Sequence, residues 1–386
     1  MKLFTNATIV IGNGEVLEEA SLLIEGKIIR QVGEVCIDSS NIDVIDAKGK
    51  VITPGLIDVH THLGVHEEGI GAEGHDFNET SSPLTPEVRA MDGINPADKG
   101  FEDARRAGIT TVQVLPGSAN VIGGEMVTLK TAGTIVDQMV IREPSGMKAA
   151  FGENPKRIHG HKGKAPITRM AIASMFRQEL LKAKHYMMEV EKEESVEIDL
   201  GLENLAKALR KEIPIRAHAH RADDIVTLIR LAKEFDLNIS IEHCTEGHQI
   251  SEFVAASNAP AAIGPTLSTR SKIELADKGW HTAGILANAG VPVSITTDHP
   301  VVGIENLLQS AALAVKHGMK TTDAWKAITL QAAKHLGVDD RVGSLEEGKD
   351  ADFVIWGGDP FDTRNEVEVT YVNGEVVYEQ EFLKEK

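Results

Sequence analysis

The sequence predicts an α/β protein in which a (β/α)₈ barrel is inserted into a small β-sandwich formed by both chain termini. Both ends of the chain consist of short apolar, β-branched runs separated by Gly and Asn turns. The middle alternates strand-like runs with amphipathic helical runs, which is typical of parallel βα units. These strands number about eight, the number that closes a barrel. We therefore expect the sandwich over residues 1–53 and 343–386, and the barrel over residues 54–342.

Turn residues bound the terminal strands. Gly12, Asn13 and Gly14 interrupt the first β-rich run, and Asn373-Gly374 is a dipeptide that favours a two-residue hairpin. We expect strands over residues 3–11, 20–24, 27–32, 352–356, 367–372 and 375–378.

The middle of the chain is expected to begin its helices and strands at recognisable signals. The first helix should start at Pro96, with Asn95 as its N-cap, and end at Gly108. The later segments follow the same alternation of apolar strand and amphipathic helix. We expect strands over residues 57–60, 109–115, one within 127–141, 147–151, 214–218, 238–243, 261–264 and 291–297, and further helices over 202–211, 222–235, 283–289, 304–317 and 322–336.

The acidic composition of the chain argues against a nucleic acid or an anionic membrane as a binding partner. The chain has 40 Lys and Arg against 58 Asp and Glu, a formal net charge of −18. Nucleic acids and anionic membrane surfaces attract basic proteins, so neither is expected here. The apolar runs are shorter than a membrane span or the core of a secretion signal. Cys36 and Cys244 do not suggest a disulfide framework, so we expect a cytoplasmic protein.

Chemically active residues follow several of the expected barrel strands, at the end where such barrels carry their sites. The first strand ends in His60-Thr61-His62, and a later one ends in His218-Ala219-His220. Residues i and i+2 on a strand face the same side, so both imidazoles of such a pair can reach one ion. His243 and Asp298 close two further strands. Imidazole and carboxylate ligands predict a divalent metal, zinc first, with iron or manganese as alternatives.

Several motifs resemble the amidohydrolase superfamily. Residues 51–62 (VITPGLIDVHTH) are similar to its first-strand signature, and residues 107–112 (AGITTV) to the entry of its second strand. Residues 342–352 (VGSLEEGKDAD) resemble its return to the terminal domain. Residues 116–124 and 152–157 resemble the imidazolonepropionase-related branch, which includes dipeptidases.

This resemblance implies a site with two metal ions. One ion would bind His60 and His62, and the second would bind His218 and His243. Asp298 would contact the metal-bound water and move its proton. A carboxylate or a carboxylated lysine would bridge the two ions. We favour Glu153, which lies just past the fourth strand, with Lys148 inside that strand as the alternative.

Substrate contacts are harder to derive from the sequence. We expect His220 to lie beside a ligand or to contact the substrate. The long insertion over residues 64–94 should cover the site, since loops of this length in a compact domain are usually functional. The His159-Gly160-His161 segment is interpreted as a mobile loop near the mouth of the site. Further candidates for substrate contact are Asn120, Arg89, Arg169 and Arg221.

The expected activity is metal-dependent hydrolysis of a C–N bond in a small amide, dipeptide-like substrate or cyclic amide. A divalent ion makes hydroxide available at neutral pH, and a carboxylate delivers the proton to the leaving nitrogen. The alternative is a mononuclear deaminase or imidazolonepropionase. Such enzymes carry a Glu three residues after the fifth-strand His, where Arg221 stands here, although Glu246 could partly substitute. A non-catalytic scaffold is disfavoured because every expected ligand is present. The resemblance also implies a homo-oligomer.

Overall fold

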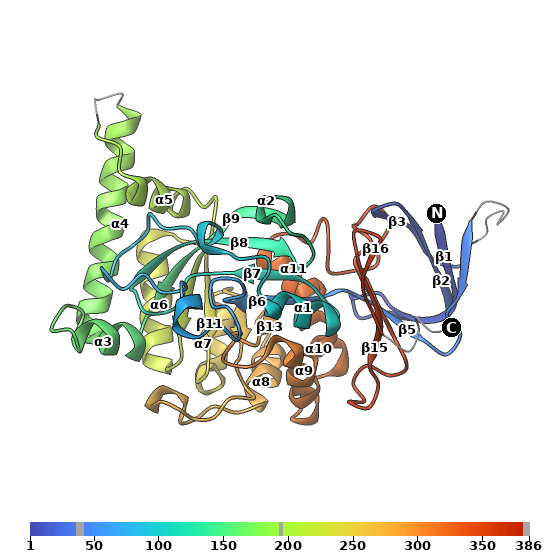
Figure 1. Ribbon diagram of the computed structural model, residues 1–386. Helices are drawn as coiled ribbons and strands as arrows, with labels where there is room; N and C mark the ends of the chain where they lie inside the picture. Colours follow the sequence, from blue (N-terminus) through green and yellow to red (C-terminus); the bar gives the residue numbers. More distant parts are fainter. Residues whose placement is uncertain (36–41, 193–195, 381–386) are drawn as a thin grey trace.

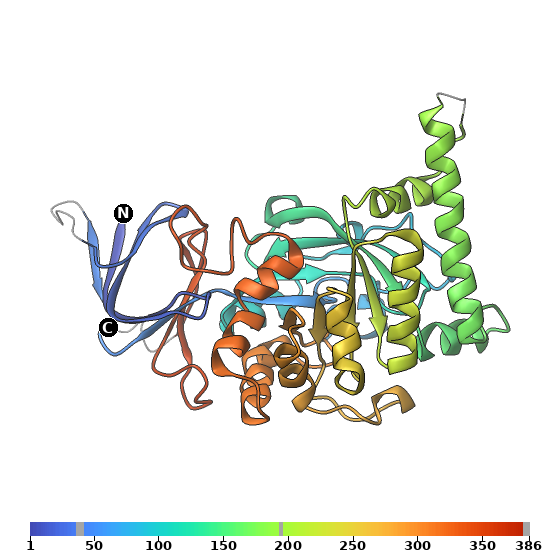
Figure 2. The same ribbon diagram turned by 180° about the vertical axis from the view of Figure 1, so that it is seen from behind.

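The computed structural model describes residues 1–35, 42–192 and 196–380 (Figure 1). Its strands form two eight-stranded sheets, one from the two ends of the chain and one from the middle. Figures 1 and 2 show the two sheets from opposite sides, with the blue and red terminal strands at one end of the molecule. The insertion of a central α/β unit between two β-rich termini therefore agrees with the sequence. Cys36 lies outside the described residues.

The terminal sheet joins strands from both ends of the chain. Its order is β16-β15-β14-β5-β1-β2-β3, and β4 pairs with β1. Phe4 packs inside it, with ring centroids 5.1 Å from Phe353 and 5.6 Å from Tyr371. Asn373 has φ 53° in the turn before the last strand, where the hairpin was expected. The strands are β1 (Lys2–Val10), β2 (Val16–Glu25), β3 (Ile28–Gly33), β4 (Asp43–Asp46), β5 (Val51–Pro54), β14 (Phe353–Trp356), β15 (Val367–Val372) and β16 (Glu375–Glu379).

The central sheet curls into a nearly closed barrel. Its order is β6 to β13 in sequence. Its first strand meets the segment after its last strand through a bridge between Thr61 and His299, and His62 N donates to His299 O at 2.9 Å. The strands are β6 (Leu56–Thr61), β7 (Ile109–Val114), β8 (Ile122–Lys130), β9 (Val140–Ala150), β10 (Ile215–Ala219), β11 (Ile239–His243), β12 (Ala261–Ile263) and β13 (Val293–Ile295).

The barrel is not wholly parallel, which corrects the sequence-based expectation. One strand was expected within residues 127–141, but β8 and β9 form a hairpin there, and β8 is antiparallel to both its neighbours. The connection over residues 131–139 holds only the four-residue α2 (Val136–Met139). A parallel crossover needs a dozen or more residues, so this connection can only reverse the chain.

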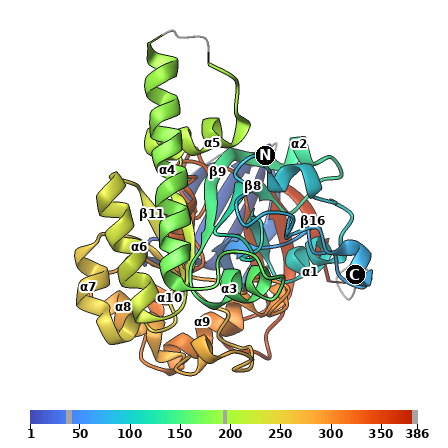
Figure 3. The ribbon, with the colours of Figure 1, turned by 90° about the vertical axis from the view of Figure 1, so that its left-hand side faces the viewer.

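Helices surround the outside of the barrel, and Figure 3 looks along it from one end. Asp98, rather than Asn95, caps the first helix, because its side chain accepts from Gly100 N. The helix expected over 322–336 is divided in two, and α3 and α4 were not expected. The helices besides α2 are α1 (Lys99–Arg106), α3 (Glu153–Gly160), α4 (Arg169–Glu191), α5 (Leu200–Leu209), α6 (Ala222–Phe235), α7 (Ser251–Ala256), α8 (His281–Asn288), α9 (Leu307–Lys316), α10 (Thr321–Ala327) and α11 (Leu330–Leu336).

None of the helices in the described ranges has both the length and the apolar character needed to cross a bilayer.

Two buried polar clusters hold this architecture together. Asp58 accepts hydrogen bonds from the hydroxyls of Thr296 and Thr297 at 2.5 and 2.6 Å, which ties β6 to the segment after β13 where the barrel closes. Lys130, on β8, lies 2.7 Å from Asp350 Oδ2 and 2.9 Å from Asp352 Oδ2. This second cluster joins the barrel to the terminal sheet.

Candidate metal centre

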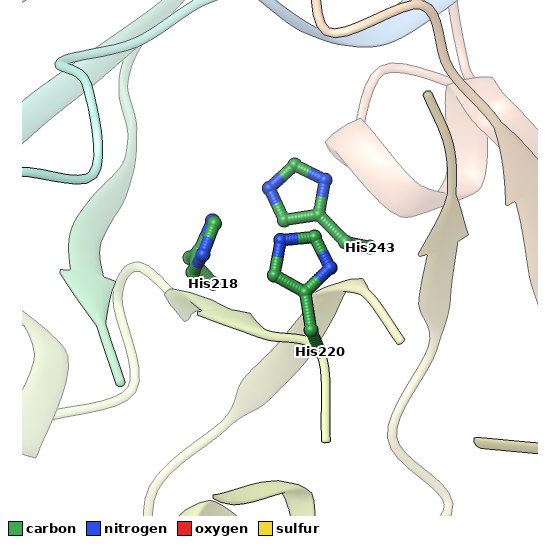
Figure 4. Close-up of side chains that lie close together, drawn as sticks. All are labelled: His218, His220 and His243. Carbon is green, nitrogen blue, oxygen red and sulfur yellow. The ribbon is translucent and has the colours of Figure 1, made fainter. Parts of the chain in front are cut away.

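Two adjoining groups of side chains could hold metal ions within the described part of the chain. His218, His220 and His243 form one group, and His60, His243 and Asp298 form the other. In each group the possible ligand atoms all lie within 4.8 Å of one another. Figure 4 shows the three imidazoles of the first group gathered above the ends of their strands. His243 belongs to both groups, so the two positions share one pocket at the carboxyl ends of β6, β10 and β11.

The strands themselves explain this convergence. His60 lies on β6 and His218 on β10, and in each case a second histidine follows two residues later on the same face. His243 ends β11 with φ 70°, and Cys244 follows with φ 46°. This left-handed pair interrupts the alternation of faces, so strand parity alone could not place Cys244. Cys244 is buried, and burial raises the pKa of its thiol to about 12.

In most of these histidines, a contact at Nδ1, on the side of the ring away from the centre, fixes the orientation of the ring. A histidine that binds metal usually donates its other ring N–H to a carbonyl or carboxylate. Backbone carbonyls accept from Nδ1 of His62 and His243, at 2.8 and 2.7 Å. The remaining Nδ1 contacts are His60 to Glu242 Oε2 at 2.7 Å and His220 to Thr245 Oγ1 at 2.7 Å. Nε2 of each ring is thereby directed toward the shared pocket.

The electrostatics favour ligand-competent protonation states. Burial lowers the pKa of His60 to about 3 and lowers the pKa values of His218 and His243, so these imidazoles are neutral at pH 7. Asp298 Oδ1 lies 3.5 Å from His60 Nε2 and 3.3 Å from His62 Nε2. Burial alone would raise the pKa of Asp298, but its contacts with His62, His243 and His60 hold it well below the usual value.

The two bridging candidates lie in different surroundings. Lys148 is fully buried on β9, and its Nζ lies 3.2 Å from His60 Nε2. Burial lowers the pKa of Lys148 to about 8. Glu153 begins α3, and its backbone N–H donates to Glu274 Oε2 at 3.0 Å. Lys148 is thus in contact with an expected ligand, and the identity of the bridge stays a prediction.

A buried ionic network beneath the centre was not anticipated. Glu242 Oε2 contacts His60, and its Oε1 accepts from Ser240 Oγ at 2.5 Å. Arg216 is fully buried beside this network, and His335 Nε2 lies 3.5 Å from Glu242 Oε1. Burial opposes the charge on Glu242, but the neighbouring rings of His335 and His60 bring its pKa well below the usual value. The alternation of polar residues on β11 was the available signal, because Ser240 and Glu242 share one face.

A second unanticipated element comes from η5 (Ile273–Leu275), after β12. Glu274 is only 1% exposed, and its Oε1 lies 3.6 Å from His218 Nε2 and 3.7 Å from His220 Nε2. Lys272 Nζ lies 2.8 Å from the same oxygen and 3.1 Å from Asn154 Oδ1. No periodic pattern in this loop pointed to the site, because neither residue follows a barrel strand directly.

Four of the residues expected to contact substrate have structural partners. Asn120 is buried and donates to Thr85 Oγ1 at 2.8 Å, and its Oδ1 lies 2.8 Å from His159 Nε2. His159 itself lies in α3 and is fully buried, which corrects the interpretation of this segment as a mobile loop. The three arginines pair with acidic residues of the chain: Arg89 with Asp92 and Glu143, Arg169 with Asp224, and Arg221 with Asp223.

The insertion over residues 64–94 covers one side of the centre, as expected. Phe77 packs against His62 with ring centroids 5.2 Å apart. Asn78 Oδ1 accepts from Ala119 N at 3.0 Å, which holds the insertion to the segment after β7. A cavity of about 170 Å³ opens between the insertion and β8. Its lining residues are Val65, Asp76, Phe77, Glu79, Val88, Arg89, Ala90, Gly93, Pro116 and Gly123.

The donor set fits a divalent metal. Neutral imidazoles and a charged carboxylate are the ligands of zinc and of similar ions. Some buried polar atoms also lack hydrogen-bond partners within the described ranges, and His243 Nε2 is among them. Buried polar atoms normally have partners, so orphaned atoms that face one pocket are consistent with ions binding between them.

Comparisons with known proteins show the family and the fold of the chain. A crystal structure of an amidohydrolase from Thermotoga maritima MSB8 is 42% identical, with a TM-score of 0.95 over 98% of this chain and 100% of that one. A prolidase crystallised with N-methylphosphonate-L-proline has a TM-score of 0.64 at 17% identity, covering 98% of this chain and 100% of that one, which shows the fold alone. An imidazolonepropionase of Picrophilus torridus is 24% identical over 374 residues, covering 89% of this chain and 87% of that protein.

Amidohydrolase tasK of Hapsidospora irregularis is 29% identical over 376 residues, which cover 90% of this chain. The chain spans only 38% of the length of that relative. The model of the amidohydrolase family matches residues 51–377, which include the whole barrel and most of the terminal sheet. The chain therefore belongs to the amidohydrolase family, is related to the imidazolonepropionases, and is an enzyme of a family that acts on carbon–nitrogen bonds.

Proposed function

We propose that the protein is a metal-dependent hydrolase of the C–N bond in a small amide, of the dipeptide or N-acyl amino acid type. The placement of Asp298 is the observation that carries this proposal. Its carboxylate lies within 3.5 Å of Nε2 of both His60 and His62, and His243 offers a further ring nitrogen in the same group. A charged carboxylate at that position can accept a proton from an attacking water and return it to the leaving nitrogen.

His60 and His62 would hold one ion, and His218 and His243 would hold a second, with zinc as the first choice of metal. Lys148 would bridge them in its carboxylated form, because a pKa near 8 leaves part of its amine neutral and able to react with carbon dioxide. Bound divalent ions supply hydroxide at neutral pH and polarise the scissile carbonyl. Glu242 keeps the ring of His60 oriented toward the centre.

The substrate class rests on the family and on the prolidase fold neighbour. A deaminase or imidazolonepropionase reaction is the second candidate, supported by the 24% identity to an imidazolonepropionase. Two residues argue against it. Arg221 occupies the position of the catalytic Glu and pairs with Asp223, and Glu246 Oε2 accepts from Ala222 N at 2.9 Å. Neither side chain offers the expected acid to a substrate.

The proposal includes the division into domains, the cellular location and the oligomeric state. We expect residues 1–53 and 343–386 to fold together as a β-sandwich domain and residues 54–342 to form a TIM-like catalytic barrel. A cytoplasmic location and assembly into a homo-oligomer stay predictions.

The test is a screen of the metal-loaded protein against dipeptides, N-acyl amino acids and cyclic amides, with release of the amine as the readout. Asp298→Asn should keep its metal and lose about 10²- to 10⁴-fold in kcat, the usual contribution of general acid–base catalysis. Full activity in Asp298→Asn would refute the assigned proton transfer. Turnover of imidazolones or amidines, without cleavage of any acyclic amide, would favour the second candidate.

A further inference from the structure

We propose that Glu274 and His220 bind the second metal ion together with His218 and His243. The inference rests on the proposed metal dependence and adds two ligands that come from outside the expected set. One of them, Glu274, is supplied by the loop after β12 rather than by the end of a barrel strand. Three imidazoles and one carboxylate are donor types that zinc binds, and the bridging Lys148 of the proposed function would be a fifth ligand.

The first argument is the spacing around Glu274. Its Oε1 lies 3.6 Å from His218 Nε2 and 3.7 Å from His220 Nε2. Both separations exceed the length of a normal hydrogen bond. They are close to the distance of about 3.4 Å between neighbouring ligands of a tetrahedral ion with bonds of about 2.1 Å. An ion between these three atoms would explain why the two rings approach the carboxylate without bonding to it.

The second argument is burial. Glu274 is 1% exposed, and the cation nearest to its Oε1 is the Lys272 ammonium at 2.8 Å. The other oxygen, Oε2, accepts from Glu153 N at 3.0 Å, which fixes the orientation of the carboxylate. A buried carboxylate is costly unless a cation compensates it, and either Lys272 or a metal ion can do so here. The fold therefore holds this oxygen rigidly toward the pocket.

The third argument concerns His220. Its Nδ1 contacts Thr245 Oγ1 at 2.7 Å, so its Nε2 is directed toward the pocket. Its ring stacks on that of His243, with centroids 4.7 Å apart and an interplanar angle of 16° (Figure 4). The possible ligand nitrogens of His218, His220 and His243 lie within 4.8 Å of one another. His220 thus has the orientation of a ligand and not only of a substrate contact.

Lys272 and Glu274 are expected to have opposite effects on metal binding. Its Nζ lies 2.8 Å from Glu274 Oε1, so without a bound ion the ammonium is the cation nearest to that oxygen. An ion bound by Glu274 would compete with Lys272, which has a second partner in Asn154 Oδ1 at 3.1 Å. Loss of Glu274 should therefore weaken metal binding, and loss of Lys272 should strengthen it. Because either change also alters the charge near the ion, the Co²⁺ absorption, and not the direction of the affinity change alone, distinguishes a ligand from a nearby charge.

The experiment measures metal binding and not activity. The protein is stripped with a chelator and titrated with Zn²⁺ against a competing indicator, and separately with Co²⁺, whose visible absorption reports coordination. The variants are Glu274→Gln, which keeps an acceptor for Glu153 N, His220→Asn, which keeps a group facing Thr245, and Lys272→Met. Glu246→Gln is the matched control, because that carboxylate bonds Ala222 N and belongs to neither ligand group.

We expect Glu274→Gln and His220→Asn to weaken the second equivalent of metal at least tenfold and to reduce the Co²⁺ absorption, with the first equivalent unchanged. Lys272→Met should tighten the second equivalent, and Glu246→Gln should match the wild type. Circular dichroism of each metal-free variant checks folding, and His220→Asn keeps the test valid if Glu274→Gln fails to fold. An unchanged second equivalent in both ligand variants overturns this inference alone. A wild-type protein that binds no metal overturns the proposed function as well.

Discussion

Glu242 is expected to contribute both to the stability of the protein and to metal binding, and the two contributions can be measured separately. It contacts His60 Nδ1 at 2.7 Å on one side and, through Ser240, lies next to Arg216 on the other. Both Glu242 and Arg216 are fully buried, so Glu242→Gln would remove the negative charge that compensates the guanidinium. Leaving one partner of a directly paired buried ion pair uncompensated costs about 3–5 kcal/mol. Ser240 lies between these two groups, so the free energy of unfolding of the metal-free protein should fall by up to that amount.

The same variant should also weaken metal binding. A residue that orients a ligating histidine usually contributes 10- to 100-fold to metal affinity. The first equivalent of Zn²⁺ should therefore bind about 10- to 100-fold more weakly in Glu242→Gln, because His60 loses its charged partner.

A double variant distinguishes the two effects. Glu242→Gln combined with Arg216→Met removes both charges and should recover most of the lost stability, while the weakened metal binding should persist. Urea unfolding measures the first quantity and indicator competition the second. The reasoning would be refuted if Glu242→Gln equalled the wild type in both, or if the double variant regained full metal affinity together with stability.

Two further predictions concern the terminal sheet. Lys130→Met should lower the free energy of unfolding by about 3–5 kcal/mol, because Asp350 and Asp352 would lose their buried counter-charge. An unchanged urea midpoint would show that this cluster does not stabilise the junction. Burial raises the pKa of Tyr371 to about 12, so its phenol should stay neutral at pH 11, where an exposed tyrosine ionises. Titration at 295 nm should show one late-titrating phenol fewer in Tyr371→Phe than in the wild type, where burial also raises the pKa of Tyr186. Since the folded state holds this proton more tightly than the unfolded state, the contribution of Tyr371 to stability should fall as pH rises from 10 to 12.

The sequence alone was enough to place those residues whose positions depend on local regularities, such as the alternation of side chains along a strand. His60 and His62 could be placed on one face because strand residues alternate, and the hairpin at Asn373-Gly374 follows from the backbone that its turn requires. Both inferences depend only on neighbours along the chain.

The sequence was insufficient where position depends on distant contacts. The direction of β8 is set by the short connection to β9, which looked like ordinary strand sequence. The orientation of His243 depends on a positive φ, which cannot be predicted from the residue type. Glu274 reaches the centre from a loop without periodicity. The contact of Lys148 with His60 depends on how β9 packs beside β6 and β10, and the choice between Glu153 and Lys148 as bridge stays a prediction.

The central claim is a centre that binds two metal ions, and elemental analysis tests it most directly. Protein purified without chelators should carry close to two equivalents of zinc, iron or manganese per chain. A value near one would favour the mononuclear alternative and contradict the bridged centre. A value near zero that added metal cannot raise would contradict metal dependence altogether.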